Sequence, residues 1–264
     1  MSLLVSLRIP DGVVVGADSL STAMGKMQAD MKGKMQCPKC QQELEIGKLP
    51  FPPLAIPMST FSFTQKVFRL GKHHAISTCG VNALQGKTIY YHIKHLERES
   101  ELPQETEELA HAVAKYFEKL VAESIPNIEK APPDFKPLSI HINGCDDEIP
   151  VTATLDIGRN TKVRIERKVG CTISGETALV TAMWEMGKKA VPLQFDYGNY
   201  SLQDAIDHVR FLIDTTAGFQ RFTRAFQTVG GQVDIAAVTP NGKFIWIEVK
   251  ALTRRLEKED EDHE

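Results

Sequence analysis

The chain opens with MSLLVSLRIPDGVVVGADS, which predicts two buried strands joined by a tight turn. Apolar residues alternate with other residues from Leu3 to Ile9, the two-residue period of a strand. Pro10-Asp11-Gly12 predicts a turn, and the apolar run at 13–17 is typical of a strand buried on both faces. Because chain ends usually fray, a sheet that begins this early must hold Ser2 in place.

The rest of the chain alternates groups of strands with pairs of helices. Helical periodicity predicts helices at about residues 81–100, 103–125, 175–188 and 202–217. Strand patterns occur in QKVFRL, HHAISTCG, LSIHING, VTATLDI, KVRIERKVG and GQVDIAAVTPNGKFIWIEV. Helices in pairs between strand groups favour an α+β domain over alternating βαβ units. His92 and His95, three residues apart on the first helix, are predicted to be exposed.

The sequence predicts one domain over residues 1–250, followed by a charged tail at 251–264. A segment at about 27–62, rich in Met, Lys, Pro and Gly, has no clean periodicity and is interpreted as an insertion. Long insertions at a surface have a small entropic cost, so deleting about residues 27–60 is expected to leave a folded protein.

The net charge of −3 and the pI near 6.3 argue against a nucleic-acid partner, which needs cations to neutralise phosphates. The sequence has no apolar run long enough for a membrane span and no signal-peptide pattern. An odd cysteine count of 5 does not suggest a disulfide framework. These features predict a cytoplasmic protein with reduced thiols and no membrane association.

The insertion contains Cys37-Pro38-Lys39-Cys40, which resembles half of a zinc ribbon. Structural zinc is held by four ligands, and the sequence has no second C-x-x-C pair. Zinc at Cys37 and Cys40 would therefore need a partner chain, or His73 or His74, to complete its coordination.

Several common catalytic motifs are absent, among them the nucleophile elbow, the H-E-x-x-H zinc helix and the Walker phosphate loop. Aminopeptidase removal of Met1 is expected to give Ser2 a free α-amine, whose ordinary pKa of about 7.7–8.0 suits a general base. The Ser2 hydroxyl could then be activated by its own amine. Lys66 would favour the neutral amine, and Asp18 would orient Lys66.

Several segments in order resemble one family. DGVVVGADSLST places Ser2 at the spacing from Asp18 at which that family has its N-terminal nucleophile. QKVFRL and ISTCGVNA resemble its lysine strand and the glycine that follows, while INGCDDEIP, VGCTISGETA and VGGQVDIAAVTPNG resemble its central strand, third helix start and last hairpin. Together they resemble proteasome β-type subunits of the N-terminal nucleophile (Ntn) hydrolases.

The resemblance implies a four-layer αββα sandwich and a proteasome-like peptidase that needs no cofactor. Ser2 would be nucleophile and base, and Asp18 with Lys66 would be its charge pair. The Gly80 N–H would form the oxyanion hole, and Ser174 would support the α-amine. Lys66→Ala is expected to lower activity by orders of magnitude while leaving folding nearly intact.

The resemblance also implies how substrates and partners bind. Thr22 would align a substrate backbone, and the specificity pocket would be lined by Ser21, Thr64, Thr78 and Asn82. These small or polar residues predict a preference for small or neutral polar residues before the cut. A homo-oligomeric ring acting on polypeptides, and an unfoldase partner, are also implied.

The sequence departs from the family pattern in several places. The family nucleophile is usually threonine, no propeptide precedes Ser2, and Phe226 and Val229 replace an Asp and a Ser.

Two alternative functions remain open: an Ntn-fold scaffold subunit without hydrolysis, and a zinc-linked adaptor that binds through the insertion. Taken singly, Gly80 and Ser174 also fit a strand end and a helix cap, and Asp18 and Lys66 fit a turn carboxylate and a surface lysine.

Overall fold

The computed structural model describes residues 2–27, 33–36, 40, 43–46, 54–190, 195–223 and 226–250. The chain divides into two compact units, one made of Met1–Ser21 with Phe61–Glu264 and the other of Thr22–Thr60. The described residues of each unit are considered separately below.

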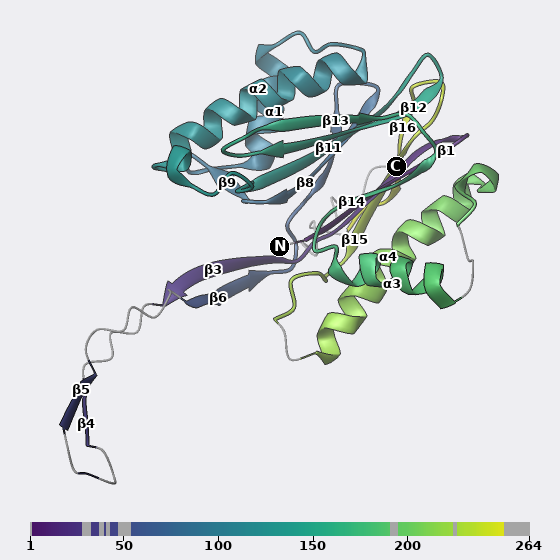
Figure 1. Cartoon of the computed structure of the whole chain (residues 1–264). Helices are drawn as coiled ribbons and strands as arrows, with labels where there is room; N and C mark the ends of the chain where they lie inside the picture. Colours follow the sequence, from purple (N-terminus) through teal and green to yellow (C-terminus); the bar gives the residue numbers. More distant parts are fainter. Residues whose placement is uncertain are drawn as a thin grey trace, which may run out of the picture. The chain divides into compact units, whose positions relative to one another are not determined.

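The first unit contains two antiparallel sheets of five strands each (Figure 1). The first sheet has the order β14-β1-β2-β15-β16, with bounds Gly170–Gly175, Leu3–Ile9, Gly12–Asp18, Val233–Val238 and Phe244–Glu248. The second has the order β13-β12-β11-β8-β7, with bounds Lys162–Glu166, Ile149–Ile157, Leu138–Asp146, His74–Gly80 and Val67–Leu70. The opening hairpin predicted from the sequence is therefore β1 and β2, and all seven residues of each are buried.

The four α-helices of the first unit occur in two pairs along the chain. Their bounds are α1 Ile89–Glu99, α2 Thr106–Ser124, α3 Ala178–Ala190 and α4 Leu202–Phe222. Short 3₁₀ turns occupy Ile128–Lys130 (η1) and Tyr197–Asn199 (η2). Ser201 is the N-cap of α4 and forms a capping box with Asp204.

The first helix begins eight residues later than its predicted start at residue 81, because a small hairpin precedes it. Its strands are β9 (Ala83–Leu84) and β10 (Lys87–Thr88), joined by Gln85 and Gly86, which both have positive φ. Left-handed backbone at both turn positions stops helix formation there.

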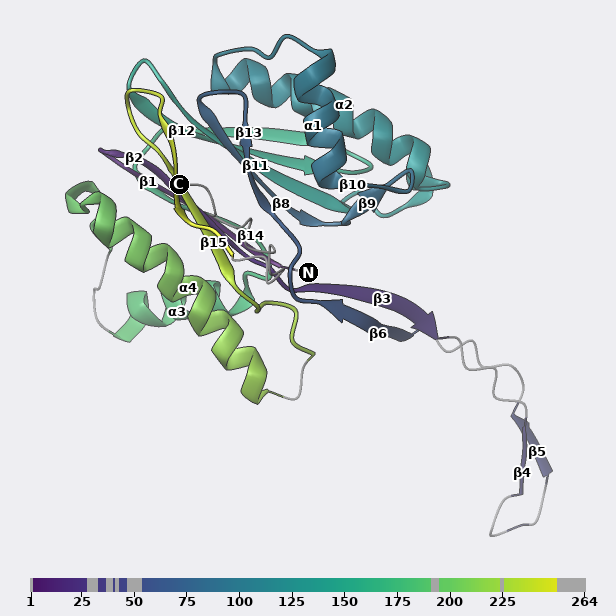
Figure 2. The ribbon, with the colours of Figure 1, turned by 180° about the vertical axis from the view of Figure 1, so that it is seen from behind.

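Three apolar clusters hold the first unit together. One joins α1 and α2 to β7, β8, β11 and β12, and another joins α4 and Val180 of α3 to β1, β2 and β15. The third lies between the two sheets and contains Leu4, Val15, Ala75 and Ala236. The helices thus cover the faces of the two sheets that point away from each other (Figures 1 and 2). This architecture of several sheets and four helices is of the α+β kind.

The second unit contains two small sheets, β3 (Ser21–Met27) with β6 (Leu54–Phe61), and β4 (Gly33–Gln36) with β5 (Glu43–Ile46). Ser21 and Phe61, at the ends of β3 and β6, belong to the first unit. Cys40 is exposed, and Cys37 lies outside the described residues.

The prediction that His92 is exposed is wrong, because its side chain is 3% exposed. It lies on the face of α1 that packs on α2, where Nε2 is 3.0 Å from the Leu84 carbonyl oxygen. A helical period predicts which residues share a face, but polar His92 shares its face with apolar Ile89, Ile93 and Leu96.

Within the described part of the chain, no helix is both long and apolar enough to cross a bilayer.

Candidate active site

The backbone on either side of the Ser2–Leu3 peptide bond is held by two hydrogen bonds from different parts of the chain. The Ser2 carbonyl oxygen accepts a 2.8 Å hydrogen bond from the Glu176 N–H, and the Leu3 N–H donates to Asp18 Oδ1 over 3.1 Å. β1 also lies between β14 and β2, with Leu3 opposite Gly175. Ser2 therefore lies directly before the first residue of the interior strand β1, and the hydrogen bonds on either side of its peptide bond hold it in place.

The Asp18 carboxylate accepts hydrogen bonds from Lys66 and from three backbone N–H groups in this region. The Lys66 ammonium donates to Asp18 Oδ1 over 3.0 Å and to the Leu20 carbonyl oxygen over 2.5 Å. The N–H groups of Leu20 and Gly230 donate to Asp18 Oδ2 over 3.1 Å and 3.0 Å. Because the Leu3 N–H and Lys66 share the oxygen Oδ1, the structure brings the lysine to the chain segment that carries Ser2.

Lys66 and Asp18 are 2% and 1% exposed, so Lys66 is not a surface lysine. Burial lowers the pKa of Lys66, while the charge and hydrogen bond of Asp18 act in the opposite direction. Burial raises the pKa of Asp18, opposed by Lys66 and by the N–H groups of Gly230 and Leu3. Such a buried pair is costly to build, and a lysine with a lowered pKa is a frequent feature of catalytic sites.

Two glycines adopt backbone conformations here that other residues rarely adopt. Gly80, at the end of β8, has φ +112°, and a Cβ would lie 2.1 Å from the Pro137 carbonyl oxygen. Gly175, at the end of β14, has φ +88°, and a Cβ would lie 1.8 Å from the Ser2 carbonyl oxygen. Both positions require glycine for a steric reason, and both lie beside Ser2.

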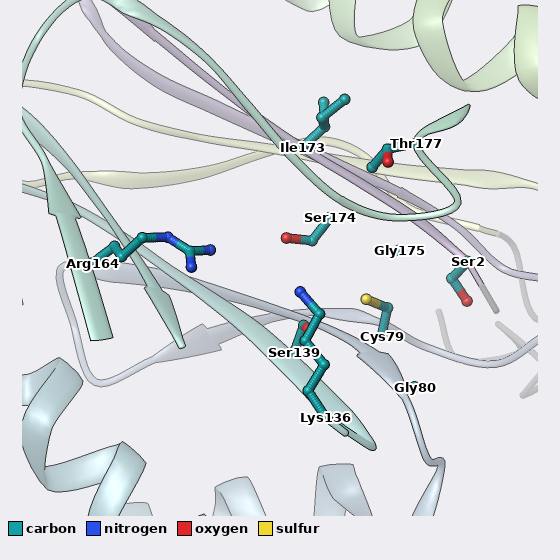
Figure 3. Close-up of a pocket in the computed structure, with 10 residues that line it drawn as sticks. All are labelled: Ser2, Cys79, Gly80, Lys136, Ser139, Arg164, Ile173, Ser174, Gly175 and Thr177. Carbon is teal, nitrogen blue, oxygen red and sulfur yellow. The ribbon is translucent and has the colours of Figure 1, made fainter. Parts of the chain in front are cut away.

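Ser2, Gly80, Ser174 and Gly175 line one cavity of about 310 Å³ (Figure 3). Its other lining residues are Cys79, Lys136, Ser139, Arg164, Ile173 and Thr177. Burial raises the pKa of Cys79 to about 12. Its thiol is therefore protonated near neutral pH, and Ser2 is the better candidate nucleophile on this wall.

A second cavity, of about 440 Å³, contains Lys66 and three of the four residues expected in a specificity pocket. These are Thr64, Thr78 and Asn82, and the fourth, Ser21, receives a short hydrogen bond from the Asn82 amide. The sequence did not indicate the remaining walls, which are Phe61, Phe63, Gln65, Thr88, Ile89 and Tyr90. The cavity is therefore larger and more aromatic than the expected small polar pocket.

Two predicted residues have surroundings that differ from the expectation. The Ser174 hydroxyl is 2.7 Å from His141 Nε2, and Figure 3 shows its side chain pointing away from Ser2. His141 Nδ1 is 2.9 Å from the Ser6 hydroxyl, so Ser174 belongs to a polar chain between the sheets. Thr22 begins the other compact unit, so the site described here does not include it.

The sequence analysis also missed a second buried ion pair near the first. Lys250 is 8% exposed and contacts the Asp234 carboxylate closely, and its ammonium donates to the Thr64 carbonyl oxygen over 3.1 Å. The charge of Lys250 further lowers the pKa of Lys66. The alternation of β15 could have placed Asp234 between the sheets, but no local pattern indicates that Lys250 folds back onto it.

The loop before β15 is supported differently from the family pattern. Val229 is fully buried in the core beneath α4, and Phe226 is 62% exposed. The Gln220 side-chain oxygen accepts from the N–H groups of Thr228 and Val229 over 2.7 Å and 3.0 Å. Gln220 thereby fixes the loop that presents the Gly230 N–H to Asp18.

Within the described residues, no three His, Cys, Asp or Glu side chains gather as a metal site would require. Cys40 is free in the described part of the chain, and His73 Nδ1 is 2.7 Å from the Gly242 carbonyl oxygen. His74 is buried, and burial lowers its pKa to about 4.

Comparisons of the sequence with protein-family models and with curated proteins found no match.

Proposed function

We propose that this protein is a peptidase of the N-terminal nucleophile class, similar to proteasome β-type subunits and built on their αββα sandwich. The observation that carries the proposal is the buried Lys66–Asp18 pair, which is tied through one carboxylate oxygen to the strand that begins with Ser2. Burying two charges is expensive, and a pair that is bonded to the strand next to Ser2 and whose lysine lines a cavity is more readily explained by catalysis than by stability.

In the proposed reaction, removal of Met1 frees the Ser2 α-amine. The amine takes the hydroxyl proton as Oγ attacks a peptide carbonyl carbon, and the negative charge develops on the carbonyl oxygen. The Gly80 N–H stabilises that oxygen, an interaction typically worth about 3 kcal/mol. The C–N bond then breaks, the proton passes to the leaving amine, and water hydrolyses the Ser2 ester.

The Lys66 ammonium, held by Asp18, favours the neutral form of the nearby amine and so keeps it able to accept a proton. The aromatic and aliphatic walls of the second cavity favour an apolar residue before the cut. This revises the preference for small polar residues that the sequence suggests, because Phe61, Phe63, Ile89 and Tyr90 enclose the site from segments outside the quoted motifs.

The family resemblance extends the proposal to a homo-oligomeric ring in the cytoplasm, acting on polypeptides delivered by an unfoldase. Zinc at Cys37 and Cys40 has no part in the proposed reaction. The scaffold alternative predicts no covalent chemistry at residue 2.

An electrophilic peptide probe with an aromatic residue next to its reactive carbon tests the proposal. Intact mass should show loss of Met1 and addition of one probe to Ser2, whereas the Ser2→Ala protein should remain unlabelled. Ser2→Thr is the matched variant that keeps the hydroxyl, and it should still be labelled. Equal labelling of wild type and Ser2→Ala would reject residue 2 as the nucleophile and leave the scaffold alternative.

A further inference from the structure

The cavity that contains Ser2 has a basic wall that the proposed reaction does not use. Lys136 precedes β11 and Arg164 lies in β13, and both side chains line the cavity. Figure 3 shows their charged ends pointing inward from one side of the cavity, with Ser2 on the other side. Their side chains are 53% and 52% exposed, so both remain accessible to a ligand.

The basic wall carries more positive than negative charge. Lys136 and Arg164 both pair with the same carboxylate, Asp156, over 3.2 Å and 3.1 Å. Asp156 also accepts a 2.9 Å hydrogen bond from the Ser139 hydroxyl, and its side chain is 8% exposed. Burial alone would raise the pKa of Asp156, but the bonds from Ser139 and Lys136 and the charge of Arg164 hold it below its ordinary value. Two cations thus share one carboxylate, and each retains free N–H donors.

The two cavities lie on opposite faces of β8. Thr78 lines the aromatic cavity and Cys79 lines the basic one, and successive residues of a strand point to opposite faces. Gly80, the next residue, lies in the wall of the basic cavity together with Ser2. Gly80 is the last residue of β8, so a peptide whose acyl side occupies the aromatic cavity would pass the end of the strand at Gly80 and Ser2 and place its leaving side in the basic cavity.

We infer that the basic cavity binds a carboxylate on the leaving side of the substrate, held by Lys136 and Arg164. This inference rests on the proposed function, because it takes Ser2 as the point of cleavage. The carboxylate comes either from an Asp or Glu that follows the cut bond or from the free C-terminus of a peptide that ends there. Guanidinium and ammonium groups both bind carboxylates through charge-assisted hydrogen bonds.

Quenched fluorescent peptides with one aromatic residue before the cut and Asp, Asn or Lys after it test the inference. With full-length protein lacking Met1, kcat/KM should be highest for Asp, and the ratio of Asp to Lys should be about fivefold, the upper end for a partly exposed charge contact. Arg164→Gln should bring this ratio towards one. Arg69→Gln, a matched loss of charge on β7 outside the cavity, should leave it unchanged.

Two further peptides identify the source of the carboxylate. One ends in a free acid one residue after the cut, and the other ends there in an amide. Faster cleavage of the free acid assigns the site to a C-terminus, whereas equal rates together with a preference for Asp assign it to a side chain. Equal rates for Asp, Asn and Lys and for both ends would overturn the inference.

A reporter that has an aromatic residue joined directly to aminocoumarin separates this inference from the proposed function, since it has no residue on the leaving side. If the reporter is cut without any charge preference among the peptides, the inference fails and the peptidase stands. If the reporter is not cut, the peptidase proposal fails. Fluorescence anisotropy of the uncut peptides on Ser2→Ala then still tests the basic cavity, which should bind Asp more tightly than Lys.

Discussion

Among single residues, Lys66 and Asp18 have the largest effect on both chemistry and stability. Each is almost fully buried, and each satisfies the other's charge. Removing one partner of such a pair leaves an uncompensated charge in the interior, which typically costs about 3–5 kcal/mol. The expectation that loss of Lys66 leaves folding nearly intact is therefore revised by its burial.

Lys66→Met and Asp18→Asn should each lower the free energy of unfolding, Lys66→Met by about 3 kcal/mol because it strands the Asp18 carboxylate. The double variant should be more stable than the sum of the two losses predicts, with a coupling energy of about 1–3 kcal/mol. Urea unfolding of the four proteins closes the cycle. Strictly additive losses would show that the two charges do not interact in the folded protein.

The sequence analysis identified Ser2, Asp18, Lys66 and Gly80 as candidate site residues, because the spacing of the strand motifs predicts where they lie in the chain. It could not reveal that Lys66 is buried, since burial of a lysine depends on what packs over it from distant segments. For the same reason Lys136, Arg164 and Lys250 escaped notice. Their partners Asp156 and Asp234 lie on other elements of the sheets.

At the scale of elements, polar as well as apolar side chains lie between the two sheets, and one of them is a histidine that contacts both. His141 of β11 lies between Ser6 of β1 and Ser174 of β14, at 2.9 Å and 2.7 Å. His141 is fully buried, and burial lowers its pKa to about 3. The two sheets are therefore joined by a histidine that is neutral across the physiological range.

Acid should loosen this contact. Between its ordinary pKa of about 6.5 and its folded value of about 3, His141 takes up a proton only when the protein unfolds, so stability falls as pH falls through that window. The expected contribution is about 1.4 kcal/mol per pH unit. In urea unfolding between pH 7 and 5, His141→Gln should reduce the pH slope. His95→Gln, a change on the half-exposed face of α1, is the control.

An unchanged pH slope in His141→Gln would place the acid sensitivity elsewhere, and His74 would be the next residue to substitute.

Among the helices and strands, long periodic segments such as α2 and α4 were predictable from their apolar stripes. The β9–β10 hairpin was not, because it depends on left-handed backbone at Gln85 and Gly86 that no apolar period reports.

At the scale of the whole molecule, the chain is divided by the segment Thr22–Thr60 into two stretches that together form one compact unit. All the described residues of the three apolar clusters belong to that unit.

Replacing residues 24–58 by an Asn-Gly turn between the ends of β3 and β6 should leave the first unit folded. β3 and β6 are neighbours in one small sheet, so a short turn can close them, and a shorter loop lowers the closure entropy slightly. Calorimetry should show one cooperative transition within about 5 °C of the parent protein. Loss of the transition would show that the segment is needed for folding.

The interior place of β1 also determines how the start of the chain moves. The amides of a buried strand that is paired on both sides exchange with solvent only when a large part of the sheet opens. Residue 2 adjoins such a strand, so the beginning of this chain should rank among its slowest-exchanging segments, where most proteins fray first. Displacing the Ser2 backbone would then require breaking the hydrogen bonds at the Ser2 carbonyl and the Leu3 N–H, whereas the hydroxyl can still turn about the side-chain torsion. A substrate that fits the site poorly would therefore have to change its own backbone conformation, because the backbone of residue 2 does not move to meet it.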